Sequence, residues 1–170
     1  MKTFNELQEG VYDPNILKAF FLAGGPGSGK SYVVQRTTGG LGMKILNSDD
    51  HFERLLKDAG LDSKMPPEQD EPRDVARDRA KEITKKRRDN YVEGRLGLII
   101  DGTGKDYDKI AYQARELEGL GYDTHMIFVN TSLDVALQRN KERDRSVPEP
   151  IAVKSWNAVQ RNIGKFSNFF

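Results

Sequence analysis

Short apolar runs recur along this chain, and each is nearly unbroken rather than alternating with polar residues. Four of these runs predict β-strands, at Phe20–Ala23, Lys44–Leu46, Leu98–Ile100 and Thr124–Val129. A strand that is apolar at almost every position is covered on both faces, which is typical of a parallel sheet whose strands are joined by helical crossovers. The pattern therefore predicts an α/β protein with a parallel sheet of about four to five strands.

The segments between the apolar runs have helical spacing. They predict helices over Ser31–Thr38, His51–Ala59, Pro72–Val92, Asp106–Leu120, Leu133–Arg145 and Ala152–Ile163. Because several prolines interrupt Asp62–Glu71 and its border, we expect that segment to be an exposed loop. The last helix and the tail are expected to pack against the sheet through aromatic residues, namely Trp156, Phe166, Phe169 and Phe170.

The N-terminal residues 1–18 fit two descriptions. Asp13-Pro14 is a suitable start for a short helix that would carry Ile16 and Leu17 into the core, and a loosely packed arm fits the same residues. A length of 170 residues is that of one compact domain. We therefore expect a single domain over residues 1–170, with residues 1–18 as an N-terminal arm.

Charge and cysteine content narrow the function classes. The 27 Lys and Arg residues nearly balance the 26 Asp and Glu residues, and a net charge of +1 provides no global field that would attract nucleic acid or a membrane surface. The chain has no cysteine, which excludes disulfides, thiolate metal sites and cysteine nucleophiles and fits a cytoplasmic protein. Because the chain has no apolar signal region and no apolar run of membrane length, we expect no membrane contact. We also expect a monomer or a weak oligomer.

A glycine-rich motif follows the first predicted strand directly. Residues 24–31, Gly-Gly-Pro-Gly-Ser-Gly-Lys-Ser, fit the pattern G-x-x-x-x-G-K-[ST]. Such a loop directs backbone N–H groups into one concavity that holds phosphate, while the Lys reaches the β- and γ-phosphates and the Ser hydroxyl coordinates Mg²⁺. The alternative, a plain strand-to-helix turn, would not require Lys-Ser at this spacing. The predicted site for ATP or GTP with Mg²⁺ comprises Gly25, Pro26, Gly27, Ser28, Gly29, Lys30, Ser31 and Tyr32.

Carboxylates follow the second and third predicted strands, at the sheet edge where α/β proteins bind ligands. We expect Asp49 to be the general base that accepts a proton from an attacking hydroxyl, and Asp50 to cap the helix that begins near His51. Asp101 ends an apolar strand as the acid of a Walker B element does, and is a candidate Mg²⁺ ligand with Ser31. The alternatives are that the first pair only caps a helix and that Asp101-Gly102 is only a turn.

Basic residues gather in two places downstream. Arg139, Lys141, Arg143 and Arg145 precede Val147-Pro148, and residues 139–148 are a candidate lid that would close over the triphosphate, with a solvated helix face as the alternative. The segment Arg73–Arg95 is also rich in Lys and Arg. It fits a solvated helix face, and if it binds an acceptor, a phosphorylated one is favoured. His51 and His125 lack the spacing of a metal site and are expected to be structural or peripheral.

Together, these motifs resemble the small P-loop kinases related to phage polynucleotide 5′-kinase and zeta-toxin kinases, over most of Phe20–Lys165. The resemblance implies a P-loop NTPase/kinase-like sheet between helices, with a basic helical lid. It implies Asp49 as the base, Lys30 as a catalytic cation, Asp101 as the metal-binding acid, and Arg143, assisted by Arg139, as the lid arginine on the triphosphate. It also implies the host cytoplasm as the location if the protein is encoded by a phage.

The reaction implied by this resemblance is ATP·Mg²⁺-dependent transfer of the γ-phosphoryl to a hydroxyl of a nucleotide, a polynucleotide end or a nucleotide-sugar. Related polynucleotide kinases have an arginine three positions after the base, where this sequence has Phe52. The acceptor therefore stays open, and net charge does not support nucleic acid. The alternative functions are a nucleoside monophosphate kinase and a nucleotide-binding ATPase or switch module, which would need a group that orients water.

Overall fold

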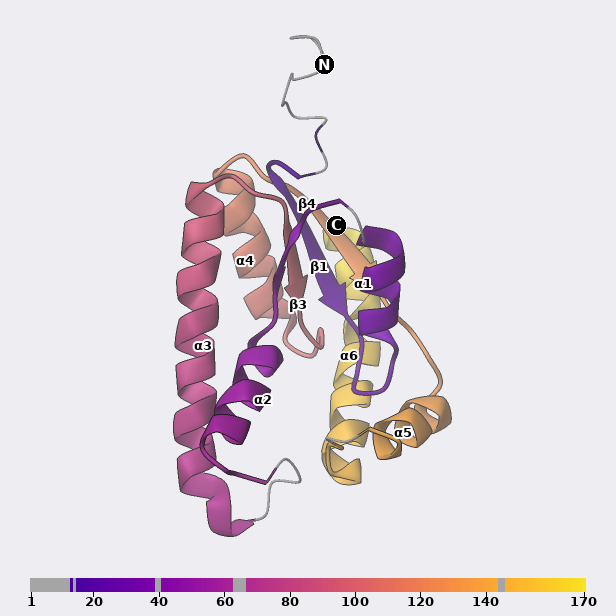
Figure 1. The fold of residues 1–170 in the computed structure, drawn as a ribbon. Coiled ribbons are helices and arrows are strands. Elements are labelled where there is room, and N and C mark those ends of the chain that lie inside the picture. The colour runs from indigo at the N-terminus through magenta and orange to yellow at the C-terminus, as the bar shows by residue number, and fades with distance from the viewer. Residues whose placement is uncertain (1–12, 14, 39–40, 63–66, 144–145) are drawn as a thin grey trace.

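The computed structural model describes residues 13, 15–38, 41–62, 67–143 and 146–170, and Figure 1 shows their arrangement. Four strands form one parallel sheet in the order β2-β3-β1-β4. Their bounds are β1 Lys18–Ala23, β2 Lys44–Leu46, β3 Leu98–Asp101 and β4 Asp123–Phe128. This order puts β1, and the glycine-rich loop that follows it, in the middle of the sheet.

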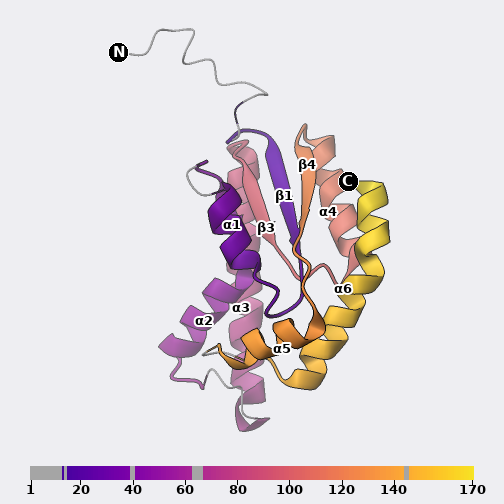
Figure 2. The same ribbon diagram turned by 90° about the vertical axis from the view of Figure 1, so that its right-hand side faces the viewer.

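Helices cover both faces of the sheet. They are α1 Lys30–Thr38, α2 Ser48–Asp58, α3 Asp70–Glu93, α4 Tyr107–Gly119, α5 Leu133–Lys141 and α6 Glu149–Phe169, with a 3₁₀ turn, η2, at Pro67–Gln69. On one face Val34 of α1 packs on Leu22 and Ile99. On the other face α4 and α6 pack on the sheet, and the two layers are separated in Figure 2. No helix within the described ranges is long and apolar enough to cross a membrane.

Helix α2 is held against α3 by a small apolar cluster of its own. Phe52 and Leu56 of α2 are buried against Ala76 and Ala80 of α3, and the guanidinium of Arg77 lies 4.3 Å from the centre of the Phe52 ring. Phe52 therefore serves as a packing residue between the two helices. The cluster fixes α2 so that its first turn stands at the carboxyl edge of the sheet.

The expected α/β fold is confirmed, and all four expected strands are present. Several helix boundaries were wrong. Helix α2 begins at Ser48 rather than near His51, and α6 runs over Glu149–Phe169 rather than Ala152–Ile163. The expected loop Asp62–Glu71 already contains η2 and the start of α3 at Asp70. The helix expected to run to Arg145 ends at Lys141, and residues 144 and 145 lie outside the described part of the chain.

The short helix expected for the N-terminal segment was wrong for residues 15–17, although Leu17 does pack against the core as expected. Ile16 forms an isolated antiparallel bridge with Leu96, and Leu17 has a left-handed φ of 50°, which is incompatible with a helix. The backbone N–H of Leu17 donates to the carbonyl of Arg95 at 2.9 Å. Residues 15–17 are therefore hydrogen-bonded beside the start of β3 rather than helical. Residues 1–12 and 14 lie outside the described residues.

Candidate active site

The glycine-rich loop connects the buried end of β1 to the first turn of α1. Gly27 and Gly29 have φ angles of 77° and 95°, in the left-handed region that favours glycine. A Cβ on Gly27 would also collide with the backbone carbonyl of Ala136 in α5. Glycine is thus required at position 27 both for the turn and for the close approach of α5.

The polar atoms of the loop are arranged to receive an anion. Lys30 Nζ donates to the carbonyl of Gly24 at 2.7 Å and lies 3.4 Å from that of Gly25. The buried Oγ of Ser28 has no hydrogen-bond partner among the described residues, which marks a place where a ligand oxygen or water is expected. Ser31, in the first turn of α1, is exposed. These features fit a triphosphate, because the lysine and loop amides have no competing carboxylate contact at hydrogen-bond distance in the part of the chain described.

The first turn of α2 carries the paired carboxylates, but neither caps the helix. Asn47 is the N-cap, with an extended backbone, and its side-chain oxygen accepts from the N–H of Asp49 at 2.8 Å. The expectation that Asp50 caps a helix beginning near His51 was therefore wrong. The physical reason is that an asparagine amide in extended conformation caps a helix as well as a carboxylate does, and Asn47 comes first after the strand. Asp49 and Asp50 instead occupy the first turn, where the helix dipole favours negative charge.

Asn47 also joins the two strand ends. Its Nδ2 donates to Oδ2 of Asp101 at 3.1 Å and to Oδ1 of Asp50 at 3.2 Å. One amide thus caps α2 and holds the acid that ends β3. Sequence reasoning missed this role, although an asparagine two residues before a pair of acids at a helix start is a capping signal that could have indicated it.

Five charged groups influence one another at this edge. Burial lowers the pKa of Lys30 from its usual value of 10.5, Arg143 lowers it further, and Asp101 and Asp49 oppose both. Burial raises the pKa of Asp101 from its usual value of 3.8; Asp49 and Asp50 add to this, whereas Lys30 and Arg143 oppose it. For Lys30 and Asp101, burial therefore outweighs their mutual attraction. A bound phosphate would favour the charged form of Lys30, and a bound cation would favour that of Asp101.

The segment after α5 is fastened by a buried asparagine. Asn140 Nδ2 donates to the carbonyl of Val147 at 2.7 Å, and the N–H of Val147 donates back to Asn140 Oδ1 at 3.1 Å. Arg143 lies between these two residues, and its charge acts on both Lys30 and Asp101. These bonds tie the end of α5 to Val147, and Arg143 lies near enough for its charge to act at the site. Arg145 lies outside the described residues.

The other lid cations differ in what they contact. Arg139 Nη1 would lie 3.5 Å from a Cβ placed on Gly29, so its guanidinium lies against the glycine-rich loop. Lys141 instead pairs with Glu149 at the start of α6, at 3.1 Å. The structure thus brings together Lys30, Asp49, Asp101, Arg139 and Arg143, whose roles in binding and catalysis remain predictions.

Helix α6 contacts the loops that surround the site. Trp156 Nε1 donates to the carbonyl of Thr131 at 3.0 Å, and its Cα would be 3.5 Å from a Cβ on Gly25. The expectation that Trp156 packs on the sheet was therefore wrong, because its indole N–H donates to a carbonyl beside the glycine-rich loop. The aromatic residues at 166, 169 and 170 do pack in the core, as expected. Asn162 Nδ2 donates to the carbonyl of Gly104 at 3.0 Å, which ties α6 to the loop after β3.

Three expected site or peripheral residues have other neighbours. Tyr32 is 64% exposed, and its hydroxyl accepts from Arg36 Nε at 3.2 Å on the same helix, so its place in the nucleotide site remains a prediction. His51 lies 3.1 Å from a guanidinium nitrogen of Arg87 in α3, and His125 is in β4. Among the described residues no group of three or more His, Cys, Asp or Glu is arranged to hold a metal ion.

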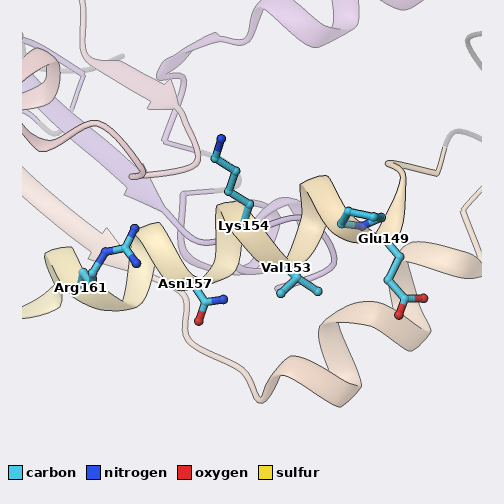
Figure 3. A pocket seen from close by; sticks show the side chains of 6 residues that line it. Glu149, Val153, Lys154, Asn157 and Arg161 are labelled. Atoms are coloured by element: carbon cyan, nitrogen blue, oxygen red, sulfur yellow. The ribbon is translucent and has the colours of Figure 1, made fainter. Parts of the chain in front are cut away.

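Two hollows lie near these elements. One of about 650 Å³ runs along α6 (Figure 3) and is lined by Glu149, Pro150, Val153, Lys154, Asn157 and Arg161. It contains none of the candidate site residues. The other, of about 540 Å³, is lined by segments of β3, α3 and α4 and includes Ser48 and Asp101. Only the second of these two hollows is continuous with the candidate site.

The fold and this site define a P-loop domain of the kinase-like type. The chain matches the model of a family described as AAA domain over residues 20–165 and belongs to that family. No curated protein matches the chain.

Solved structures show the same fold in kinases. A chain of the Pnkp1/Rnl/Hen1 RNA repair complex is 20% identical with a TM-score of 0.66, covering 89% of this chain and 46% of that one. A chain of the PezAT chromosomal toxin–antitoxin system of Streptococcus pneumoniae is 16% identical with a TM-score of 0.63, covering 89% and 65%. Shikimate kinase from Acinetobacter baumannii is 18% identical with a TM-score of 0.50, covering 90% and 80%. This chain thus spans less than two thirds of the first two, and at these identities the likeness concerns the fold.

Proposed function

We propose that the protein is an ATP·Mg²⁺-dependent phosphotransferase that moves the γ-phosphoryl of ATP to a hydroxyl group of an acceptor. The observation that carries the proposal is the gathering of charged groups at one edge of the sheet. Lys30 lies on the loop carbonyls, Asn47 ties Asp101 to the first turn of α2 that bears Asp49, and the charge of Arg143 acts on Lys30 and Asp101. Phosphoryl transfer needs cations around the phosphates and a carboxylate that accepts the proton of the acceptor hydroxyl, and these residues supply both.

The loop and its lysine bind the nucleotide in this proposal. Backbone amides of residues 25–29 surround the phosphates, and Lys30 exchanges the carbonyls of Gly24 and Gly25 for phosphate oxygens. Ser31 and Asp101 would hold Mg²⁺, which would supply neutralisation of the phosphate charge. Such a site would not require a cluster of protein carboxylates.

The transfer itself is assigned to groups on α2 and the lid. Asp49 accepts the proton of the acceptor hydroxyl as its oxygen attacks the γ-phosphorus. The bond from that phosphorus to the bridging oxygen breaks, and ADP leaves with the electron pair. Arg143, with Arg139 against the loop, neutralises charge on the transferring group. Asn47 keeps Asp101 and the first turn of α2 at a fixed separation.

Transfer of radiolabel from γ-labelled ATP tests the proposal. Labelled product is expected with one acceptor class from nucleosides, nucleotides, nucleotide-sugars and hydroxyl-ended oligonucleotides, and Asp49→Asn should reduce it by about 10²-fold or more. Asp58→Asn, at the exposed far end of the same helix, is the matched control and should transfer normally. Strong ATP hydrolysis without any acceptor, equal in Asp49→Asn and the native protein, would instead indicate an ATPase or switch. A run with labelled GTP determines the nucleotide preference.

A further inference from the structure

A cavity of about 540 Å³ adjoins the proposed site of transfer. Its volume falls within the range of about 300 to 1,000 Å³ that is common for small-ligand sites. Its apolar lining comes from the sheet and α4, through Phe21, Leu22, Leu46, Ile100 and Ile110. Ser48 and Asp101 also line it, so the cavity opens onto the edge where Asp49 stands.

The polar lining of this cavity carries an excess of positive charge. Its basic residues are Lys81, Lys85 and Arg88 of α3 with Lys105 and Lys109 at the start of α4, whereas its acids are Asp101 and Asp106. On α3 the spacing of these basic residues is that of one helix face. Part of the segment Arg73–Arg95 thus lines the cavity, although Lys81 and Lys85 are also solvent-exposed.

Existing ion pairs neutralise only some of these cations. Lys81 pairs with Asp78 at 2.8 Å and Arg88 with Glu116 at 2.5 Å. Lys85, Lys105 and Lys109 have no carboxylate partner in the part of the chain that the structure describes. Of the two acids, Asp106 already accepts the N–H of residue 109 as the cap of α4. Three uncompensated ammonium groups around one cavity favour a multiply charged anion.

We infer that this cavity binds the acceptor, and that the acceptor is a small molecule that already carries a phosphate monoester. The inference rests on the proposed function and deepens it. Lys85, Lys105 and Lys109 hold the acceptor's phosphate, the apolar lining contacts its body, and a hydroxyl is directed to Asp49. That hydroxyl loses its proton to Asp49 and gains the γ-phosphoryl, while ADP is released. The product then bears one phosphoryl group more than the acceptor.

The charge pattern outside the cavity argues for a small acceptor over a nucleic acid strand. A strand would need a basic track along the surface. On α3 outside the cavity lining, Arg73 pairs with Asp70 and Arg79 with Glu82. The net charge of the chain is only +1.

A binding experiment that does not depend on catalysis tests the inference. The protein is saturated with β,γ-imido ATP and Mg²⁺ so that the loop is filled, and inorganic phosphate is then titrated in by calorimetry. We expect phosphate to bind, and the double variant Lys85→Ala with Lys109→Ala to weaken it by about tenfold or more. Lys86→Ala, an exposed neighbour outside the cavity lining, is the control and should bind as the native protein does.

The outcomes separate the two proposals. If the ATP analogue binds normally but phosphate does not, this inference is overturned and the proposed function stands. The same holds if the double variant binds phosphate as tightly as Lys86→Ala does. If the analogue itself fails to bind, the proposed function fails. In the transfer assay the label should enter phosphorylated compounds rather than their unphosphorylated counterparts, and a preference for hydroxyl-ended oligonucleotides over nucleoside monophosphates would contradict the small acceptor.

Discussion

The buried side chain of Asn140 exchanges hydrogen bonds of 2.7 and 3.1 Å with the carbonyl and N–H of Val147, and the segment they enclose carries Arg143. These bonds fix the end of α5 and the start of the approach to α6. Because a lid arginine must reach the triphosphate with a defined geometry, Asn140 is a positioning residue for Arg143 in the proposed reaction.

We predict that Asn140→Ala lowers kcat through misplacement of Arg143. It also leaves the N–H and carbonyl of Val147 without a partner, which costs about 1 to 3 kcal/mol of unfolding free energy. Asn140→Asp can still accept from the N–H and should recover part of both losses. Urea unfolding and steady-state kinetics measure them, with the exposed Asn157→Ala as control. Native kinetics in Asn140→Ala would show that the bonds serve stability alone.

The lid arginine should matter more for turnover than for binding. Arg143→Ala is expected to lower kcat by about 10³-fold or more, since arginines that neutralise a transferring phosphoryl act mainly in the transition state. The affinity for β,γ-imido ATP should change much less. Lys141→Ala is the matched control, because Lys141 lies two residues away and pairs with Glu149. Equal turnover in the two variants would remove Arg143 from the mechanism.

Position 27 should accept only glycine. Gly27→Ala would force a side chain into a φ of 77° and against the carbonyl of Ala136 in α5. We expect a loss of about 1 to 3 kcal/mol in unfolding free energy, together with weaker binding of the ATP analogue, because the loop and α5 must move apart. Thermal unfolding and calorimetry measure both effects. Gly119→Ala, where a Cβ would meet no atom within 4 Å, is the control and should stay near the native values.

The sequence predicted the elements that depend on local pattern. Unbroken apolar runs located all four strands, and the glycine-rich motif located the loop, since both signals lie within a few neighbouring residues. The cap at Asn47 was missed because three adjacent polar residues offer competing caps. The cavity could not be predicted, since Lys85 and Lys109 come from separate helices and meet only through packing. Trp156 was misassigned for the same reason, as its partner Thr131 is distant in sequence.

Asp101 should reduce the stability of the unliganded protein at neutral pH. Burial and the neighbouring Asp49 and Asp50 raise its pKa above the usual 3.8. A carboxyl whose folded pKa is raised binds its proton more tightly in the native state, so its contribution to stability is fully present below pH 3.8 and is lost as pH rises through the folded pKa. Asp101→Asn removes this loss, because a neutral amide of the same shape does not ionise.

We therefore expect Asp101→Asn to unfold at a higher temperature than the native protein at pH 7, with the difference shrinking as pH falls toward 4. The same variant should lose Mg²⁺-dependent phosphoryl transfer, and Mg²⁺ with β,γ-imido ATP should raise its unfolding temperature less than that of the native protein, since ligand stabilisation follows affinity. Asp106→Asn, on the next loop, controls for a general effect of charge. A lower unfolding temperature for Asp101→Asn at pH 7 would show that the attraction of Lys30 outweighs burial at Asp101.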